Sequence, residues 1–410
     1  MAVINRCNSD SKTDKLLSNI YMISIVLCFL SIIVRDIGAS YYPVSQWNAS
    51  RFIFEASLPG LATLFDLMQQ VTLLCLILIL IVKNQNQNWL LILAALFTFF
   101  VYGLVAVFGE GVELREAAFG GVPLVACLVP LFFLAGEDRP LIKSIIKYCH
   151  VISGLAFFLG IVSATKFQID CGLGATIGWC PARDYLAIGM SFLWISIAVG
   201  SKPSLYFRQI GLCLFACVLS LLLTTRSWLI QPLLAMLMLT LTSPVEFRFK
   251  RTFTVVLICI STLLMISFFI PSIVEVFEAR IGEDTRSGQY EVFFEQVDPE
   301  SLVVGNGITA GYSYGDDSNY RWFDNQFLYL AYHFGLIPCL VLGYVFCKVL
   351  FGPTHMKVKF VCLAYYAALF GLSNYYSFAL NCGVAGIFIV FGGCSSKSQI
   401  ANRRNERLGG

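Results

Sequence analysis

Residues 60–82 read GLATLFDLMQQVTLLCLILILIV, an apolar run in which Asp66 is the single charged residue. A helix needs about 20 predominantly apolar residues to cross the hydrocarbon core of a bilayer. The run does not alternate between apolar and polar residues as a barrel strand would, and a helix satisfies its own backbone hydrogen bonds in lipid. The stretch therefore predicts a transmembrane helix.

Comparable runs recur along the whole chain of 410 residues, of which 58% are hydrophobic and 13% charged. Soluble domains are roughly 45–50% apolar and about 25% charged, so this composition excludes a soluble enzyme, a nucleic-acid binder and a disordered scaffold. We expect an all-α protein, a polytopic transmembrane helical bundle that forms one domain over residues 1–410. The ~12 predicted spans lie at about 16–34, 60–82, 89–108, 120–135, 144–164, 185–200, 209–225, 228–243, 253–273, 326–347, 360–376 and 382–394.

Lysine and arginine orient this bundle, because cytoplasmic loops carry an excess of both. With the N-terminus in the cytoplasm and the spans alternating, about two thirds of the 28 Lys and Arg fall in inner segments, which predicts that both termini are cytoplasmic. The outer cations are arginines except for Lys166. Two explanations stay open: the loss of lysine from outer loops, or an anionic substrate held by the arginine fork. The outer arginines are Arg35, Arg51, Arg115, Arg183, Arg226, Arg280, Arg286 and Arg321.

The largest outer loop covers residues 274–325 and is acidic and rich in glycine and tyrosine. Loops of this length are usually functional. Within it, residues 290–297 predict a short amphipathic helix on the membrane surface. Its apolar contacts would be Tyr290, Val292, Phe293 and Phe294.

Two of the 15 cysteines, Cys171 and Cys180, share another outer loop. An oxidising outer compartment would let them pair. A disulfide and two free thiols both remain open for this loop.

Two polar positions suggest chemistry. Arg226 follows one predicted span and precedes the next, and an arginine at that depth is costly without an anionic partner, unless it snorkels to water. Asp324-Asn325 lies where the large loop enters the span at 326–347. Both residues suit the capping of that helix, and an Asp324 kept ionised at a helix N-terminus also suits a weak general base.

Histidines and a hydrolase-like pattern fit structural roles better. Gly311 to Gly315 match the G-x-S-x-G elbow of hydrolases, but they lie in a polar loop without a nearby histidine base, so we interpret the match as accidental. We expect His333 and His150 to be packed or hydrogen-bonded inside the bundle, and His355 to be exposed.

Acidic residues leave two further alternatives. Asp66 lies inside a predicted span, where it marks either a proton or substrate path or an interhelical hydrogen bond. Asp316, Asp317 and Asp324 could hold a divalent cation, although acidic loop residues are usually solvated. The favoured prediction is that the protein uses no metal.

Four short patterns stand out along the chain: Thr225-Arg226-Ser227, Asp284 to Gly288 with Gly305-Asn306-Gly307, Asp324-Asn325 through Gly335-Leu336-Ile337, and Trp179 to Ala187. Together they resemble the bacterial O-antigen ligase and O-antigen polymerase superfamily (WaaL-like and Wzy-like proteins). Members are polytopic inner-membrane glycosyltransferases with about a dozen spans and one large periplasmic loop late in the chain. Ligases usually carry His-Asn where this chain has Asp324-Asn325, and Asp-Asn looks more like a polymerase. Polymerases often have Glu-Pro where this chain has Cys180-Pro181.

The resemblance implies transfer of a glycan from one undecaprenyl-diphosphate-linked oligosaccharide to another at the periplasmic face of the bacterial inner membrane. Arg226 and Arg286 would neutralise the diphosphate, and Asp324 would accept or orient the proton of the acceptor hydroxyl. Direct attack would invert the anomeric centre, and no cofactor is expected. Expected partners are the donor and acceptor lipids, membrane lipid and a chain-length regulator protein, but no nucleic acid. Candidates for substrate binding are Arg183, Arg280, Arg321, Asn325 and Tyr320.

Two other functions stay open. An O-antigen ligase would transfer the glycan to lipid A core, and the aspartate at position 324 argues mildly against it. A polysaccharide or lipid transporter would carry out no chemistry. Transporters more often show inverted repeats and polar groups at the midplane, whereas the charges here gather at the outer face.

Overall fold

The computed structural model describes residues 2–43, 51–84, 88–177, 180–200, 203–242, 253, 285–314, 317–321, 323, 325–369 and 381–395. In this part of the chain six helices are long and apolar enough to cross a membrane, so the protein is a helical membrane protein. These six spans are Lys15–Asp36, Pro59–Lys83, Trp89–Gly109, Pro140–Cys171, Pro181–Val199 and Leu205–Leu222.

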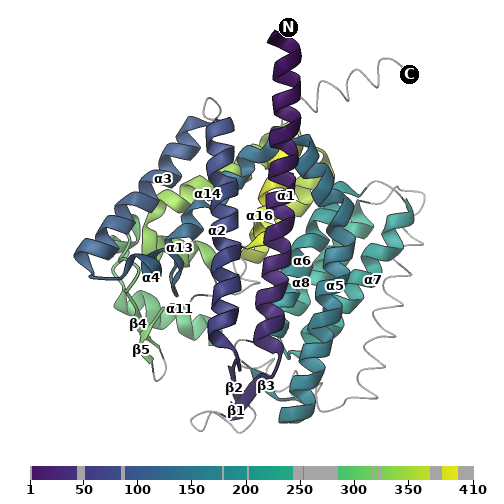
Figure 1. Ribbon diagram of the computed structural model, residues 1–410. Helices are drawn as coiled ribbons and strands as arrows, with labels where there is room; N and C mark the ends of the chain where they lie inside the picture. Colours follow the sequence, from purple (N-terminus) through teal and green to yellow (C-terminus); the bar gives the residue numbers. More distant parts are fainter. Residues whose placement is uncertain are drawn as a thin grey trace. The chain divides into compact units, whose positions relative to one another are not determined.

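Figure 1 labels most of the helices and strands along the sequence. The helices before the large loop are α1 (Ala2–Asp36), α2 (Pro59–Lys83), α3 (Trp89–Leu104), the π-helix η1 (Val105–Gly109), α4 (Leu114–Phe119), the 3₁₀ helix η2 (Leu124–Glu137), α5 (Arg139–Cys171), α6 (Pro181–Val199), α7 (Pro203–Leu222) and α8 (Arg226–Leu241). The later helices are α11 (Thr285–Gln296), α12 (Ser301–Val304), α13 (Gln326–Phe334), α14 (Leu336–Phe351), α15 (Met356–Ala367) and α16 (Cys382–Ser395). The strands are β1 (Ser40–Pro43), β2 (Arg51–Glu55), β3 (Thr176–Ile177), β4 (Tyr312–Tyr314) and β5 (Asp317–Tyr320).

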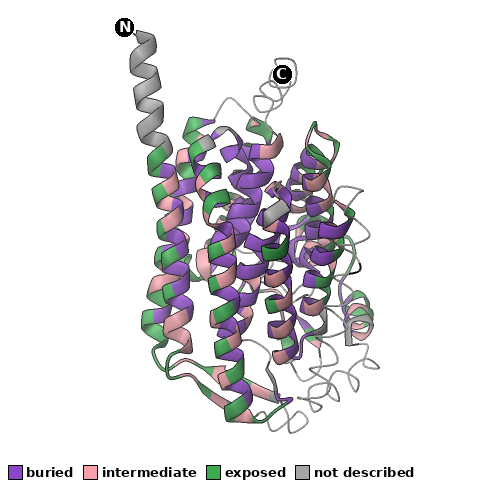
Figure 2. Cartoon of the chain, turned by 90° about the vertical axis from the view of Figure 1, so that its right-hand side faces the viewer, coloured by how far each residue is buried: buried purple, intermediate pink, exposed green. Residues whose placement is uncertain are grey.

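The long helices differ in how much apolar surface they leave exposed. Of the 18 most apolar consecutive residues, 28% are buried in the span at α2 and in the span at α3, whereas 78% are buried in α6. Exposed residues, green in Figure 2, recur along the helix faces. An apolar face of this kind suits contact with lipid, while α6 is a core helix of the bundle.

Several predicted spans take a different form from a full-length helix. The span expected at 326–347 is broken by Gly335, which has a φ of 71° and separates α13 from α14. The span expected at 120–135 is the 3₁₀ helix η2, which has Pro130 inside it. Helices α8, α14 and α16 are shorter apolar helices. Most of the span expected at 253–273 lies outside the described residues, so the count of ~12 stays a prediction.

The chain forms two compact units, each assembled from segments that are distant in the sequence. Unit 1 comprises Met1–Val26, Leu67–Ile145 and Asp284–Gly410, and unit 2 comprises Leu27–Asp66 and Ile146–Glu283. The expectation of one membrane domain over residues 1–410 stays a prediction.

In unit 2, the ends of α5 and α7 lie next to the starts of α6 and α8. Near the end of α5, the Nε2 of Gln168 donates to the carbonyl of Ala175 at 3.0 Å and to that of Leu222 at 2.8 Å. Ala175 precedes β3 and the start of α6, and Leu222 is the last residue of α7, shortly before α8 begins. Helices α5 to α8 also run side by side in Figure 1. When consecutive spans alternate in direction, the end of one span lies at the same end of the bundle as the start of the next.

The end of α1 and the start of α2 reach the same end of unit 2. The hydroxyl of Ser163 on α5 donates to Asp36 Oδ1 at 2.8 Å, and the hydroxyl of Ser31 donates to the carbonyl of Ala62 at 3.1 Å. Strands β1 and β2 pair antiparallel between α1 and α2, and β2 pairs parallel with β3. These aromatic and β-branched segments lie outside the spans and pair with one another. The protein is mainly helical, as expected, and these short strands lie in its connecting segments.

The core of unit 1 is the packing of η2 against α16. Residues Cys382 to Gly393 of α16 are all buried. A Cβ on Gly136 would overlap the carbonyl of Gly392, so the two backbones approach at a distance that only glycine permits. The hydroxyl of Tyr21 on α1 ties its helix to the start of α16 by donating to the carbonyl of Cys382 at 2.6 Å.

Candidate functional site

The predicted site residues are divided between the two units. Arg183 and Arg226 belong to unit 2, and the large-loop candidates that the structure describes belong to unit 1. Asp324 and Arg280 lie outside the described residues. The loop candidates that the structure describes are Arg286, Tyr320, Arg321 and Asn325.

Arg183 and Arg226 both lie in the first turn of a helix, at the end of unit 2 where α6 and α8 begin. Arg183 is the third residue of α6, and Arg226 is the first residue of α8. The turn before α8 is sharp, because Thr224 has a φ of 50° and the amide of Thr225 donates back to the carbonyl of Ser220 at 3.1 Å. Free backbone N–H groups at a helix N-terminus favour anions, and arginine adds a bidentate donor. The two helix starts thus bring two arginine positions to this end of unit 2, which also carries the carboxylates of Asp36 and Asp184.

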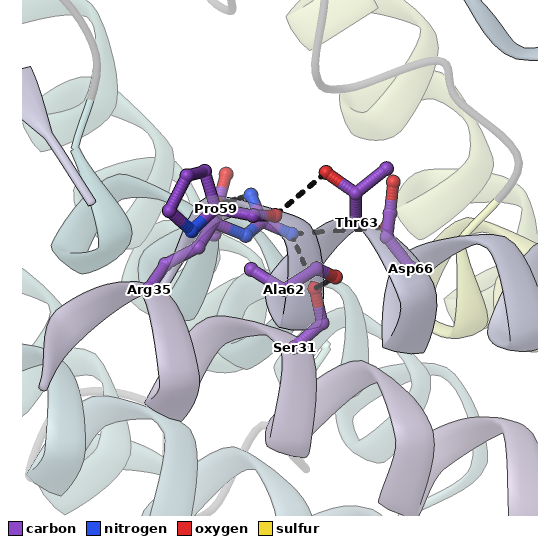
Figure 3. A network of polar contacts seen from close by, with 7 residues as sticks. Ser31, Arg35, Pro59, Ala62, Thr63 and Asp66 are labelled. Atoms are coloured by element: carbon purple, nitrogen blue, oxygen red, sulfur yellow. Dashed lines mark hydrogen bonds and ion pairs between the residues drawn. The ribbon is translucent and has the colours of Figure 1, made fainter. Parts of the chain in front are cut away.

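A network around Arg35, which the sequence interpretation missed, lies at the same end of unit 2. Arg35 donates from Nη1 to Asp184 Oδ2 at 3.0 Å and from Nη2 to the hydroxyl of Ser31 at 2.8 Å. Its Nη2 also lies 3.7 Å from Asp66 Oδ1. Figure 3 shows Ser31 and Arg35 of α1 facing Ala62 and Asp66 of α2. Asp66 thus has an interhelical ion pair, which favours the structural alternative for this residue.

The network predicts unequal effects of two isosteric substitutions on stability. The Asp184 side chain is 11% exposed, whereas that of Asp66 is 43% exposed and beyond hydrogen-bond distance. We expect Asp184→Asn to lower the free energy of unfolding by about 1–3 kcal/mol, because it leaves a largely buried guanidinium without its closest charge partner. Asp66→Asn should cost less than about 1 kcal/mol. Thermal unfolding in detergent measures both, and a larger loss of Tm for Asp66→Asn would contradict the assignment.

Cys171 and Cys180 are both free thiols, so the structure contains no disulfide between them. Cys180 is buried and immediately precedes α6. Burial raises the pKa of its thiol to about 11. The thiol is therefore protonated and unreactive near neutral pH.

The large loop is folded around the side chain of Phe293. This ring is fully buried and lies 4.8 Å from that of Phe323 and 5.1 Å from that of Tyr312, between centroids. The predicted short helix exists as α11, but Phe293 packs inside the loop, so its assignment as a membrane contact is wrong. Phe294, the next residue, is 52% exposed.

Tyr320 lies at the edge of this aromatic cluster. Its ring centroid is 5.6 Å from that of Tyr312 and 5.3 Å from that of Tyr314, across the pair of strands β4 and β5. Tyr312 is buried and its hydroxyl accepts from Gln289 Nε2 at 2.7 Å, and burial raises the pKa of this phenol. Tyr314 and Tyr320 are half-buried, so part of each ring is open to a ligand.

The Gly305-Asn306-Gly307 pattern is a backbone junction between the loop and the end of α13. The amide of Asn306 donates to the carbonyl of Tyr332 at 2.7 Å, and the amide of Gly307 donates to that of His333 at 3.1 Å. These bonds satisfy carbonyls that the end of a helix leaves without intrahelical partners. From the end of η1, Glu110 Oε2 accepts from the amide of Thr309 at 3.1 Å.

Gly305→Ala tests this junction. Gly305 has a φ of 87°, and a Cβ there would lie 2.5 Å from the amide nitrogen of Gly335. Strain and the clash with backbone should lower the free energy of unfolding by about 1–3 kcal/mol. Gly343→Ala on α14 is the matched control, since nothing lies within 4 Å of its Cβ position. Equal Tm values for the two variants would contradict the role of Gly305.

Asn325 caps α13, as predicted. Its Oδ1 accepts from the amides of Phe327 at 3.0 Å and Leu328 at 3.1 Å. The residues on either side of position 324 are therefore fixed, with Phe323 in the aromatic cluster and Asn325 at the helix start. Arg321 is half-buried, and its carbonyl faces His333 Nε2 at 3.2 Å.

The structural interpretations of the histidines and of the hydrolase-like pattern are confirmed. Ser313 lies in strand β4, which pairs with β5 rather than leading into a helix. His333 is fully buried and hydrogen-bonded, His150 Nε2 lies 3.1 Å from the Ser196 hydroxyl, and His355 is exposed. Among the described residues no group of three or more His, Cys, Asp or Glu could hold a metal ion. The alternative metal site includes Asp316 and Asp324, which lie outside them.

No family model and no curated protein matches this chain.

Proposed function

We propose that this membrane protein is a glycosyltransferase of the O-antigen polymerase type. It would transfer a glycan from one undecaprenyl-diphosphate-linked oligosaccharide to the nonreducing-end sugar of another, at the periplasmic face of a bacterial inner membrane. The support is the resemblance of its short sequence patterns to that superfamily, together with a helical membrane fold. Both termini would then lie in the cytoplasm.

The single observation that carries the proposal is the pair of arginine-bearing helix starts in unit 2. Arg183 and Arg226 lie in the first turns of α6 and α8, at the end where these helices begin. A diphosphate is the anion that this arrangement suits, because it needs several donors for its oxygens. Arg286, near the start of α11, would supply a further cation from the loop.

The proposed reaction is a direct displacement at the anomeric carbon of the donor sugar. The bond from that carbon to the diphosphate oxygen breaks, and its electron pair leaves with the diphosphate. An acceptor hydroxyl oxygen forms the new glycosidic bond and gives its proton to Asp324. The arginines stabilise the charge that develops on the leaving group, so the proposed reaction uses no metal. The proposed reaction is inverting because the displacement is direct. Tyr320 and Tyr314 would stack on the sugars.

The function is tested by measuring the length of surface glycan on cells that lack the native protein, with and without complementation. Complementation with wild type should restore a ladder of glycan lengths on a gel, whereas cells without the protein should show single repeats attached to the surface acceptor. If single repeats also fail to reach the acceptor, the protein is a ligase or an exporter and the proposal is wrong.

A further inference from the structure

We propose that residues 301–309 form a re-entrant segment, which enters the bilayer from the loop side, contacts acyl chains through α12 and returns to the same side. The sequence pattern assigns all of residues 274–325 to an outer loop in water. The contacts of α12 with the break between α13 and α14 place it deeper than that. The inference does not depend on the proposed reaction, and the residues that carry it all belong to unit 1.

The break between α13 and α14 lies inside the bilayer. Near the end of α14, the ammonium of Lys348 and the hydroxyl of Tyr344 donate to Asn88 Oδ1 at 3.2 Å and 3.1 Å, and Asn88 directly precedes the span that begins with α3. The two helix ends are therefore level. Helix α14 has 16 residues and rises about 24 Å, which is less than the thickness of a hydrocarbon core of about 30 Å. A tilt of α14 would shorten this rise and place the break at Gly335 deeper still.

A ring contact at the other side of the break agrees with this depth. Phe334, the last residue of α13, lies 5.7 Å from Tyr102, between ring centroids. Tyr102 belongs to the span Trp89–Gly109, which continues for about two more helical turns toward the loop side. The break is thus level with the interior of this span and not with its end.

Helix α12 reaches the break with its backbone. A Cβ on Gly335 would lie 2.6 Å from the carbonyl oxygen of Val303 and 2.7 Å from that of Val304. The valine side chains are nevertheless exposed, Val303 by 56% and Val304 by 71%. Leu336 and Leu340, one turn apart at the start of α14, are exposed as well. The valines thus extend an exposed apolar surface of a membrane helix, and at this depth the partner that such a surface fits is the acyl chains of lipid.

The backbone next to α12 meets the requirement that hydrocarbon imposes, because unpaired N–H and C=O groups are costly there. The amides of Asn306 and Gly307 donate to carbonyls at the end of α13, and that of Gly305 donates to the carbonyl of Ser301 at 2.7 Å. The side-chain amide of Asn306 donates to the Ser301 hydroxyl at 3.2 Å. These hydrogen bonds allow a turn without regular helical structure to lie at this depth.

The chain is polar on both sides of α12. After it, the amide of Thr309 donates to Glu110 Oε2 at 3.1 Å, and Glu110 directly follows the end of the α3 span. Before it, Asp298 and Glu300 are exposed, and carboxylates suit water or headgroups better than acyl chains. The segment therefore enters and leaves on the same side, with α12 as its deepest part.

Electron paramagnetic resonance of a nitroxide label measures this depth in the full-length protein. The label is attached to p-acetylphenylalanine at one position, because 15 native cysteines preclude a cysteine label. The protein is reconstituted in liposomes of phosphatidylcholine and phosphatidylglycerol. Collisions of the label with oxygen report acyl chains, and collisions with the chromium oxalate anion report water, since the anion is excluded from hydrocarbon. Val304 is the test position, Leu340 the lipid control and Glu291 the control for an exposed loop residue.

We expect the ratio of oxygen to chromium oxalate collisions to be about tenfold higher at Val304 than at Glu291, and similar at Val304 and Leu340. Val303 carries the same expectation, so the test remains if a label at Val304 prevents folding. A ratio at the valines like that at Glu291 would place α12 in water. Few collisions with either agent would mean that protein, such as a second copy of this chain, covers the valines. Either result would overturn the proposal.

Discussion

Asp324→Asn should reduce glycan polymerisation by about two to four orders of magnitude, the range that a general base typically contributes. The amide keeps the size of the carboxylate and its ability to accept a hydrogen bond, but it cannot take a proton from the acceptor hydroxyl. Asn325 caps α13 through its side chain, so the substitution at position 324 should leave the helix start intact. The measurement is the rate of chain extension by purified protein.

Glu291→Gln provides the matched control for this experiment. Glu291 is an exposed carboxylate on α11 of the same loop, and its removal changes the loop charge by the same amount. We expect wild-type rates for this variant. An Asp324→Asn protein that extends chains at the rate of Glu291→Gln would show that position 324 has no role as a base.

Arg226→Ala should lower kcat/KM by about 100- to 1,000-fold, the cost typical of losing one preorganised group that stabilises developing charge. Arg226 is the first residue of α8, the helix start at which we propose that the diphosphate binds. Arg226→Lys should recover only part of this loss, because an ammonium cannot bind two phosphate oxygens in the planar geometry of arginine. Steady-state kinetics on the purified variants measure both effects.

Arg115→Ala controls for a general loss of positive charge. Arg115 is an exposed residue of α4 and belongs to the same group of arginines assigned to outer segments. It should retain wild-type kcat/KM. If Arg115→Ala and Arg226→Ala lose activity equally, the effect is one of net charge and the diphosphate assignment is wrong.

Apolar runs predicted the long helices well, because the requirement for internal hydrogen bonding in lipid leaves a run of about 20 apolar residues few other structures. The same logic fails where the run is interrupted. Gly335 takes a positive φ and ends α13 after nine residues, which hydropathy averaged over a window cannot register. Position-specific turn chemistry therefore decided that boundary.

The folded loop could not be predicted from local pattern. The segment 290–297 has the composition of a surface helix, and Phe293 was assigned to lipid because a single segment does not reveal what else packs on it. Its actual neighbours, Phe323 and Tyr332, come from other parts of the loop and from α13. The glycines at 305 and 307 were recognised as a pattern, and their positive φ angles explain why glycine is needed there.

The ion pair between Arg35 and Asp184 shows the same limit for the polar residues. The two residues are 149 positions apart in the chain, and neither belongs to a recognisable motif with the other. Arg35 is one of the outer arginines for which substrate binding was considered, but its partner is a protein carboxylate. Sequence placed these charges at one end of the spans, and the fold determined which of them pair.

The central claim is that this chain extends a lipid-linked glycan by itself. The most direct test is to reconstitute the purified protein in liposomes with one defined undecaprenyl-diphosphate-linked oligosaccharide and to analyse the products by mass. The account predicts a series of lipid-linked products that differ by one repeat, with release of undecaprenyl diphosphate for each repeat added. Unchanged substrate, with a protein that is folded and inserted, would contradict it.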